Sequence, residues 1–202
     1  MGITDRRKRQ KEEVRAAILS TSWQMVKSEG WQALSIRKIA EAIEYSVPVI
    51  YDHFASKEAI LLEFAREGFR LLSAEMAAAS ARHTAPEDQI RAMADAYWHF
   101  AFRNKEHYQL MFGLGMATCE AGQCMPEKTA FRDCLAAPIL TLLKTNAQAS
   151  DANMGCLKYH TLWSVMHGLV SIKMMESSDV SDELNKMVLD DAVNGFIRNL
   201  KG

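Results

Sequence analysis

The sequence contains few of the residues that cross-link or interrupt a chain, with four cysteines, four prolines and ten glycines among 202 residues. No two cysteines form a C-x-x-C pair and no histidine lies at a zinc-finger interval, so the pattern predicts no metal site and no other cofactor. Nucleophile–base pairs, paired carboxylates and an H-E-x-x-H cluster are also missing, which argues against an enzyme.

Long apolar runs are absent as well. No stretch approaches the roughly 20 apolar residues of a membrane-spanning helix, and no secretory apolar segment follows the cationic start of the chain. We therefore expect a cytoplasmic protein with no membrane partner and with reduced cysteines. The net charge is −1, but residues 1–58 carry ten Lys and Arg against eight Asp and Glu, a weak sign of an anionic partner.

Strand-like alternation is nearly absent, whereas apolar residues recur at helical spacing. The sequence therefore predicts an all-α protein of about nine helices. A cationic arm over residues 6–11 precedes the first helix, which Gly30 ends. The inner stripe of this helix is formed by Val14, Ile18, Thr21 and Met25.

Later helices are marked mainly by their caps and breaks. Thr84 and Glu87 have capping-box spacing and predict a helix that runs to Arg103. Asn104 can cap the next helix, and the glycine-containing stretch 113–128 indicates a loop. Three more helices are expected over residues 129–148, 152–176 and 182–200.

Two short helices near the N-terminus, over residues 35–43 and 47–54, are separated by only three residues. This spacing is typical of a helix-turn-helix. The residues assigned to packing are Ile39, Ala40, Ile43, Ile50, Tyr51 and Phe54. The residues assigned to the outward side of the second helix are Pro48, Val49 and Asp52.

This segment resembles the tetracycline-repressor (TetR) family. The shared pattern is Ser35-x-Arg37-x-Ile39-Ala40-x-Ala42, then Ser46, then Ile50-Tyr51-x-His53-Phe54-x-Ser56-Lys57-Glu58. The family usually has glycine where this chain has Glu44, and a small apolar residue where it has Tyr45. In the C-terminal part, Trp163-x-x-x-His167-Gly168 looks like the Trp…His-Gly signature of one subgroup.

The resemblance implies a DNA-binding transcriptional regulator that is most commonly a repressor. It places a helix-turn-helix DNA-binding domain at residues 1–55 and a larger helical ligand-binding and dimerisation domain at residues 56–202. The partners implied are a palindromic double-stranded DNA operator, a small-molecule effector and a second copy of the chain. The DNA-binding residues implied are Ser35, Arg37, Tyr45, Ser46, Val47, Pro48, Val49, Tyr51, His53 and Lys57.

Among these residues, Val47, Pro48 and Val49 would meet base edges, with apolar contact to thymine methyl groups. Arg37 would contact a phosphate or a guanine edge, and the others would hold the backbone.

Aromatic and methionine side chains are concentrated over residues 93–116, where they are suited to an apolar effector pocket. The candidate ligand-binding residues are Tyr97, Trp98, Phe102, Met111, Phe112, Met116, Tyr159, Trp163 and His167. The last two helices are the candidates for dimerisation, because Gly168 and Gly195 suggest close helix packing. The stripe of the last helix that could meet a second copy comprises Leu184, Met187, Val188, Asp191, Ala192, Gly195 and Phe196.

Two alternatives remain open from the sequence alone. Cys119 and Cys124, with Cys134 nearby, could make the same fold a thiol or redox sensor. The chain could also be a helical protein–protein interaction module that never binds nucleic acid.

Overall fold

The computed structural model describes residues 3–112, 125–145, 152–175 and 181–201, and all regular structure in these residues is helical. This confirms the predicted all-α class. The elements are α1 (Ile3–Glu29), the short 3-10 helix η1 (Trp31–Ala33), α2 (Ile36–Ala42), α3 (Val47–Tyr51), α4 (Lys57–Ser80), α5 (Pro86–Arg103), α6 (Lys105–Phe112), α7 (Pro126–Thr145), α8 (Ala152–Met175) and α9 (Asp182–Lys201). Within these ranges no helix is both long and apolar enough to cross a membrane.

The described residues fall into two compact units. The first contains the chain up to Gly68 together with α6 from Glu106 onwards, and the second contains Phe69–Lys105 and the described residues from α7 to the C-terminal end. Helix α4 therefore supplies its first half to one unit and its second half to the other. The division at residues 55 and 56 stays a prediction for the functional domains.

The first unit has a continuous core formed by α1, α2, α3, the start of α4 and Leu110 of α6. Ile18, Ile39, Ile50 and Ile60 are completely buried at its centre. The predicted inner stripe of α1 was partly wrong. Ser22 and Val26 are buried, whereas Thr21 and Met25 are only half-buried, because burial follows a regular i, i+4 spacing from Val14.

Two predicted boundaries differ from the structure. The cationic arm does not precede the first helix but forms its first turns, since α1 begins at Ile3. The capping box at Thr84 does not form. Ala85 is the N-cap residue of α5 and Pro86 occupies the first turn, where proline's fixed φ suits helix initiation.

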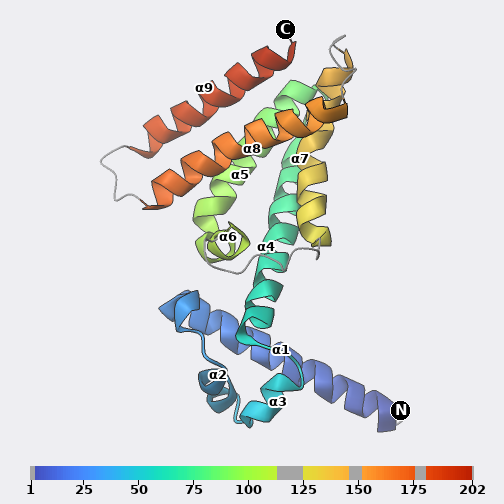
Figure 1. Ribbon diagram of the computed structural model, residues 1–202, viewed down its shortest axis with the longest axis vertical. Helices are drawn as coiled ribbons and strands as arrows, with labels where there is room; N and C mark the ends of the chain where they lie inside the picture. The colour runs from blue at the N-terminus through green and yellow to red at the C-terminus, as the bar shows by residue number, and fades with distance from the viewer. Residues whose placement is uncertain (1–2, 113–124, 146–151, 176–180, 202) are drawn as a thin grey trace. The chain divides into compact units, whose positions relative to one another are not determined.

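The second unit is a bundle of the C-terminal half of α4 with α5, α7, α8 and α9 (Figure 1). Helix α9 lies along α8 and also packs on α5. Its buried face consists of Asn185, Leu189, Val193, Ile197 and Leu200. Predicted and observed ranges of the last three helices agree within a few residues, as periodicity allows.

Candidate nucleic-acid interface

The turn between α2 and α3 holds both helices in a fixed arrangement. Ser35 and Ser46 are the N-cap residues of α2 and α3, with extended backbones and no side-chain cap hydrogen bond. Glu44 adopts a left-handed φ of 58°, and the Tyr45 N–H donates to the Ala40 carbonyl at 2.9 Å. Glu44 therefore takes the left-handed conformation that glycine adopts more freely, which fits the glycine usual at this position in the family.

Helix α3 is short, and it is anchored through one buried face. Ile50 is fully buried and Phe54, just after the helix, is 5% exposed. The Arg15 guanidinium of α1 lies 4.9 Å from the centre of the Phe54 ring and forms an ion pair at 3.0 Å with Glu63 of α4. The first contact ties the residues just after α3 to α1, and the second ties α1 to α4. The other face of α3 is left to solvent.

The outward face of α3 and the turn before it carry an apolar centre and two aromatic hydroxyl groups. Pro48 is exposed, and Val47 and Val49 are half-buried because they also pack on the core. Tyr51 was predicted to be an inner residue, and this was wrong, because 52% of it is exposed. Tyr45, in the turn before α3, is 44% exposed. Both hydroxyl groups are therefore available to an external partner.

Polar residues flank this face. Ser46 and Arg37 are exposed, and Ser35 and His53 are half-buried. His53 Nδ1 is buried and has no hydrogen-bond partner among the described residues. Lys57 Nζ donates to the Gln32 carbonyl at 3.0 Å, so in this structure the ammonium group braces η1 against the start of α4.

Residues at the start of α4 already pair with some of the free backbone N–H groups of its first turn. The Ala59 N–H donates to Ser56 Oγ at 3.3 Å, so Ser56 caps the start of this helix. Two hydrogen bonds, one from the backbone at Glu58 and one from the Ser56 side chain, lower the pKa of the Glu58 carboxyl. A phosphate approaching Lys57 would therefore meet a helix start that an internal carboxylate already stabilises.

One groove beside this face was not predicted from the sequence. It has a volume of about 550 Å³ and is lined by Arg6, Arg9, Gln10 and Glu13 of α1 and by Tyr45 of the turn. The helical spacing of the four polar residues was the available signal. It was missed because the cationic segment was expected to lie outside the helix.

In the second unit, α8 brings three of the candidate ligand residues into one column. Tyr159, Trp163 and His167 follow one another at four-residue intervals and their rings are stacked, with centroids 6.3 Å and 5.5 Å apart. The Tyr97 hydroxyl lies 3.4 Å from His167 Nδ1, and Ser171 Oγ lies 3.4 Å from Nε2. The column combines apolar ring faces with a few polar atoms.

Burial sets the charge of this column. It lowers the pKa of His167 and raises the pKa of Tyr159 to about 12. At neutral pH the imidazole and the phenol are therefore both uncharged, which suits an apolar or weakly polar ligand.

The remaining candidate ligand residues are distributed differently. Trp98 and Phe102 pack edge to face and line a groove of about 640 Å³ between α5, the end of α8 and the start of α9. Met111 and Phe112 belong to the first unit, where a Cβ on Gly68 would lie 2.5 Å from Met111 Sδ. Met116 lies outside the described residues.

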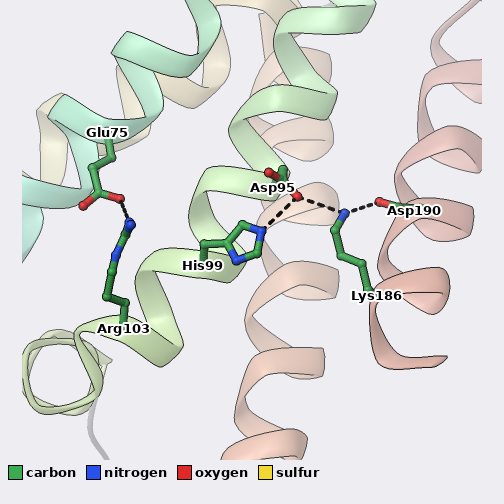
Figure 2. Close-up of polar contacts among 6 residues, drawn as sticks. All are labelled: Glu75, Asp95, His99, Arg103, Lys186 and Asp190. Carbon is green, nitrogen blue, oxygen red and sulfur yellow. Dashed lines mark hydrogen bonds and ion pairs between the residues drawn. The ribbon is translucent and has the colours of Figure 1, made fainter. Parts of the chain in front are cut away.

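A second, larger groove of about 860 Å³ runs along α4, α5 and α9 and is lined by charged side chains. Figure 2 shows that they pair with one another. Asp95 Oδ1 lies 3.1 Å from Lys186 Nζ and 3.5 Å from His99 Nε2, and Arg103 forms an ion pair with Glu75. Burial acts to lower the pKa of Lys186, but its hydrogen bonds to Asp190 and Asp95 raise it. Because these charges compensate one another, the groove makes no clear demand for a charged ligand.

The cysteine alternative gains little from the structure. Cys119 and Cys124 lie outside the described residues. Cys134 is half-buried and burial raises the pKa of its thiol, while Cys156 is exposed. A thiol with a raised pKa is less reactive than an ordinary one.

A short helix anchored by one face, with aromatic hydroxyl groups and cations around the other, defines a helix-turn-helix DNA-binding regulator. Comparison with known proteins supports this class. Residues 18–64 match the family described as bacterial regulatory proteins of the tetR family, and residues 90–192 match the tetracyclin repressor-like C-terminal domain. The chain belongs to the TetR family of transcriptional regulators.

Individual relatives agree with this assignment. The chain is similar to an uncharacterized HTH-type transcriptional regulator of Mycobacterium tuberculosis, with 26% identity over 183 residues, 87% of this chain and 78% of that protein. Its fold is similar to that of a protein with unknown function from Rhodococcus sp. RHA1, with 23% identity and a TM-score of 0.72, covering 92% of this chain and 93% of that one. It is also similar to a TetR-family regulator from Streptomyces coelicolor, with 21% identity and a TM-score of 0.63, covering 95% and 97%.

Proposed function

We propose that this protein represses transcription in the cytoplasm by binding a pseudo-palindromic operator as a homodimer, and that a small, largely apolar ligand releases it. The observation that carries the DNA-binding part is the exposed face of α3. Pro48 and Tyr51 are solvent-accessible on a helix of five residues whose other face is held by the fully buried Ile50. A rigidly supported short helix is the element that a major groove accepts.

The exposed side chains suggest how recognition is divided. Val47, Pro48 and Val49 offer methyl and methylene groups but no strong hydrogen-bond donors, which suits contact with thymine methyl groups and selection by DNA shape. Tyr45, Tyr51, Arg37 and Lys57 would supply donors to phosphates on either side. Phosphate contacts give affinity and register, whereas base contacts give sequence preference.

Selection of bound duplexes from a random pool, followed by binding titrations on the selected sequence, tests this proposal. We expect Tyr51→Ala to weaken binding by on the order of tenfold, equivalent to about 1.4 kcal/mol. Tyr51→Phe separates the hydroxyl from the ring, and thermal melting controls for folding. A purified protein that holds no duplex at low salt, or a Tyr51→Ala variant with unchanged affinity, contradicts the assigned face.

The dimer is supported by the exposed surface of α8 and α9. Ile172, Met175 and Met187 are 51%, 77% and 66% exposed, and aliphatic side chains gain from burial against an apolar surface. Gly168 has no heavy atom of the described residues within 4 Å of where a Cβ would lie, and Gly195 has only the Arg198 guanidinium at 3.7 Å. Neither glycine is needed for packing within one subunit, so a second copy is the partner they favour.

Ligand release is proposed to act through the second unit. The column of Tyr159, Trp163 and His167, with Tyr97 beside it, would contact the effector, and α4 continues from this unit into the DNA-binding unit. The ligand must bind one state of the dimer more tightly than the other to change operator affinity.

A panel of apolar and amphipathic compounds, screened by the shift in melting temperature, would identify a ligand. Its addition should weaken operator binding, and the transcript from a promoter that carries the operator should recover. Trp163→Ala should abolish the shift, with Trp31→Ala in the first unit as the matched control. A ligand that binds the column and leaves DNA affinity unchanged would refute the release mechanism.

A further inference from the structure

We propose that the first turns of α1 form a second DNA-backbone site, in which Arg6, Arg9 and Tyr45 hold a phosphate next to the segment read by α3. The inference rests on the proposed function, and it extends the DNA contacts beyond the helix-turn-helix. The ligand class is the sugar–phosphate backbone of a duplex.

The cationic segment, residues 6–11, is helical. Because α1 begins at Ile3, Arg6, Arg9, Gln10 and Glu13 lie at i, i+3, i+4 and i+7 and share one face of the helix. These four residues and Tyr45 line one groove, and all five are exposed. The buried Val14 and the half-buried Ala17 also line it.

The position of Tyr45 connects this groove to the reading helix. Tyr45 is followed directly by Ser46, the N-cap residue of α3. Its ring therefore borders both the groove and the start of α3. A duplex docked on α3 would pass its backbone beside Tyr45, where the hydroxyl and two guanidinium groups offer donors.

The charge of the groove selects an anion. Two arginines, one amide and one phenol face a single carboxylate, Glu13. Guanidinium groups bind phosphate oxygens through paired hydrogen bonds, and these are stronger than neutral ones. The carboxylate of Glu13 would repel the same phosphate. Removing its charge should therefore change DNA affinity in the opposite direction to removing an arginine.

The experiment measures affinity for the selected duplex, with its native flanking base pairs, over a series of salt concentrations. Arg6→Gln combined with Arg9→Gln is compared with Lys8→Gln combined with Lys11→Gln. The control removes the same charge from exposed residues that do not line the groove.

Each phosphate contact contributes about 0.9 to the slope of log affinity against log salt. We expect the arginine pair to reduce this slope by up to about 2 and to lower affinity at 0.1 M salt by on the order of tenfold or more. The lysine pair should change the slope by less than half as much. Glu13→Gln should raise affinity.

Equal effects of the two pairs, or no gain from Glu13→Gln, would overturn the second site while leaving the helix-turn-helix interface intact. Loss of the arginine effect on a duplex trimmed to the sequence read by α3 would support it, because the flanking phosphates would be missing. If the unmodified protein holds no duplex at all, the proposed function itself fails and this inference fails with it.

Discussion

The two compact units expose different kinds of large apolar side chain. In the described part of the first unit these are Tyr45, just before α3, and Tyr51, the last residue of α3. In the second unit they are mainly aliphatic, with Ile172, Met175 and Met187 among the most exposed. A phenol combines a ring with a hydroxyl group and suits a hydrated, charged partner, whereas an aliphatic chain suits a dry one. The type of exposed side chain thus distinguishes a nucleic-acid surface in the first unit from a protein–protein surface in the second.

The strongest test of this contrast is to place a charge on the aliphatic surface. Met187→Glu should convert the dimer into a monomer, because burying an unpaired carboxylate costs several kcal/mol. Duplex affinity should fall by at least an order of magnitude, since two linked DNA-binding units bind far more tightly than one. Light scattering after size-exclusion chromatography measures the first effect, and a binding titration measures the second.

The control for this variant is Leu71→Glu, which places the same charge on a 37% exposed residue of α4. It should remain dimeric, and circular dichroism should show that both variants keep their helices. A Met187→Glu protein that still forms dimers would show that this aliphatic surface is not the dimer interface. The contrast between the two units would then no longer distinguish a protein–protein surface from a nucleic-acid surface.

A smaller effect is expected in the turn that positions α3. Glu44 has the only positive φ among the described non-glycine residues, at 58°. Glu44→Gly removes the Cβ that disfavours this conformation, and we expect the free energy of unfolding to rise by up to about 1 kcal/mol. Glu41→Gly, inside α2, should lower it by about the same amount. Urea denaturation of both variants distinguishes them, and a destabilised Glu44→Gly protein would show that the carboxylate stabilises the turn.

Local periodicity was sufficient to predict most of this first unit. Ile39, Ala40, Ile50 and Phe54 are buried as their spacing indicated, because each helix is short and packs through one face. Tyr51 was assigned wrongly because Ile50 and Phe54 already fill the single buried face of a helix that ends at Tyr51. Adjacent residues point about 100° apart, so Tyr51 is left on the open side.

The contacts that the sequence could not supply are long-range. Tyr97 meets His167 across 70 residues of sequence, and no spacing rule connects two distant helices. The helical state of residues 6–11 was missed because these polar residues make no apolar stripe. Charged pairs such as Lys8 with Glu12, one turn apart, support a helix without one. The candidate effector residues stay predictions, because the stacking of their rings does not by itself identify a ligand.

Two histidines, one in each unit, have pKa values that burial lowers. His107 in α6 is the more completely enclosed. It stacks on Trp23 with centroids 4.1 Å apart, and its Nδ1–H donates to the Phe64 carbonyl at 3.0 Å. That hydrogen bond and the nearby carboxylates of Glu67 and Glu106 act to raise the pKa, but burial outweighs them.

The lowered pKa of His107 predicts a stability that depends on pH. In the unfolded chain this imidazole takes up a proton near pH 6.5, whereas the folded protein resists protonation. The free energy of unfolding is therefore fully retained above about pH 6.5 and declines as the pH falls towards the lowered folded value. His107→Gln keeps a hydrogen-bond donor and removes the titration, so its stability should decline less between pH 7.5 and 5.5. His83→Gln, at an exposed residue, should behave like the unmodified protein. If His107→Gln retains the full decline, His167 and the carboxylates must account for it, and the acid-sensitive contact would lie outside the first unit's core.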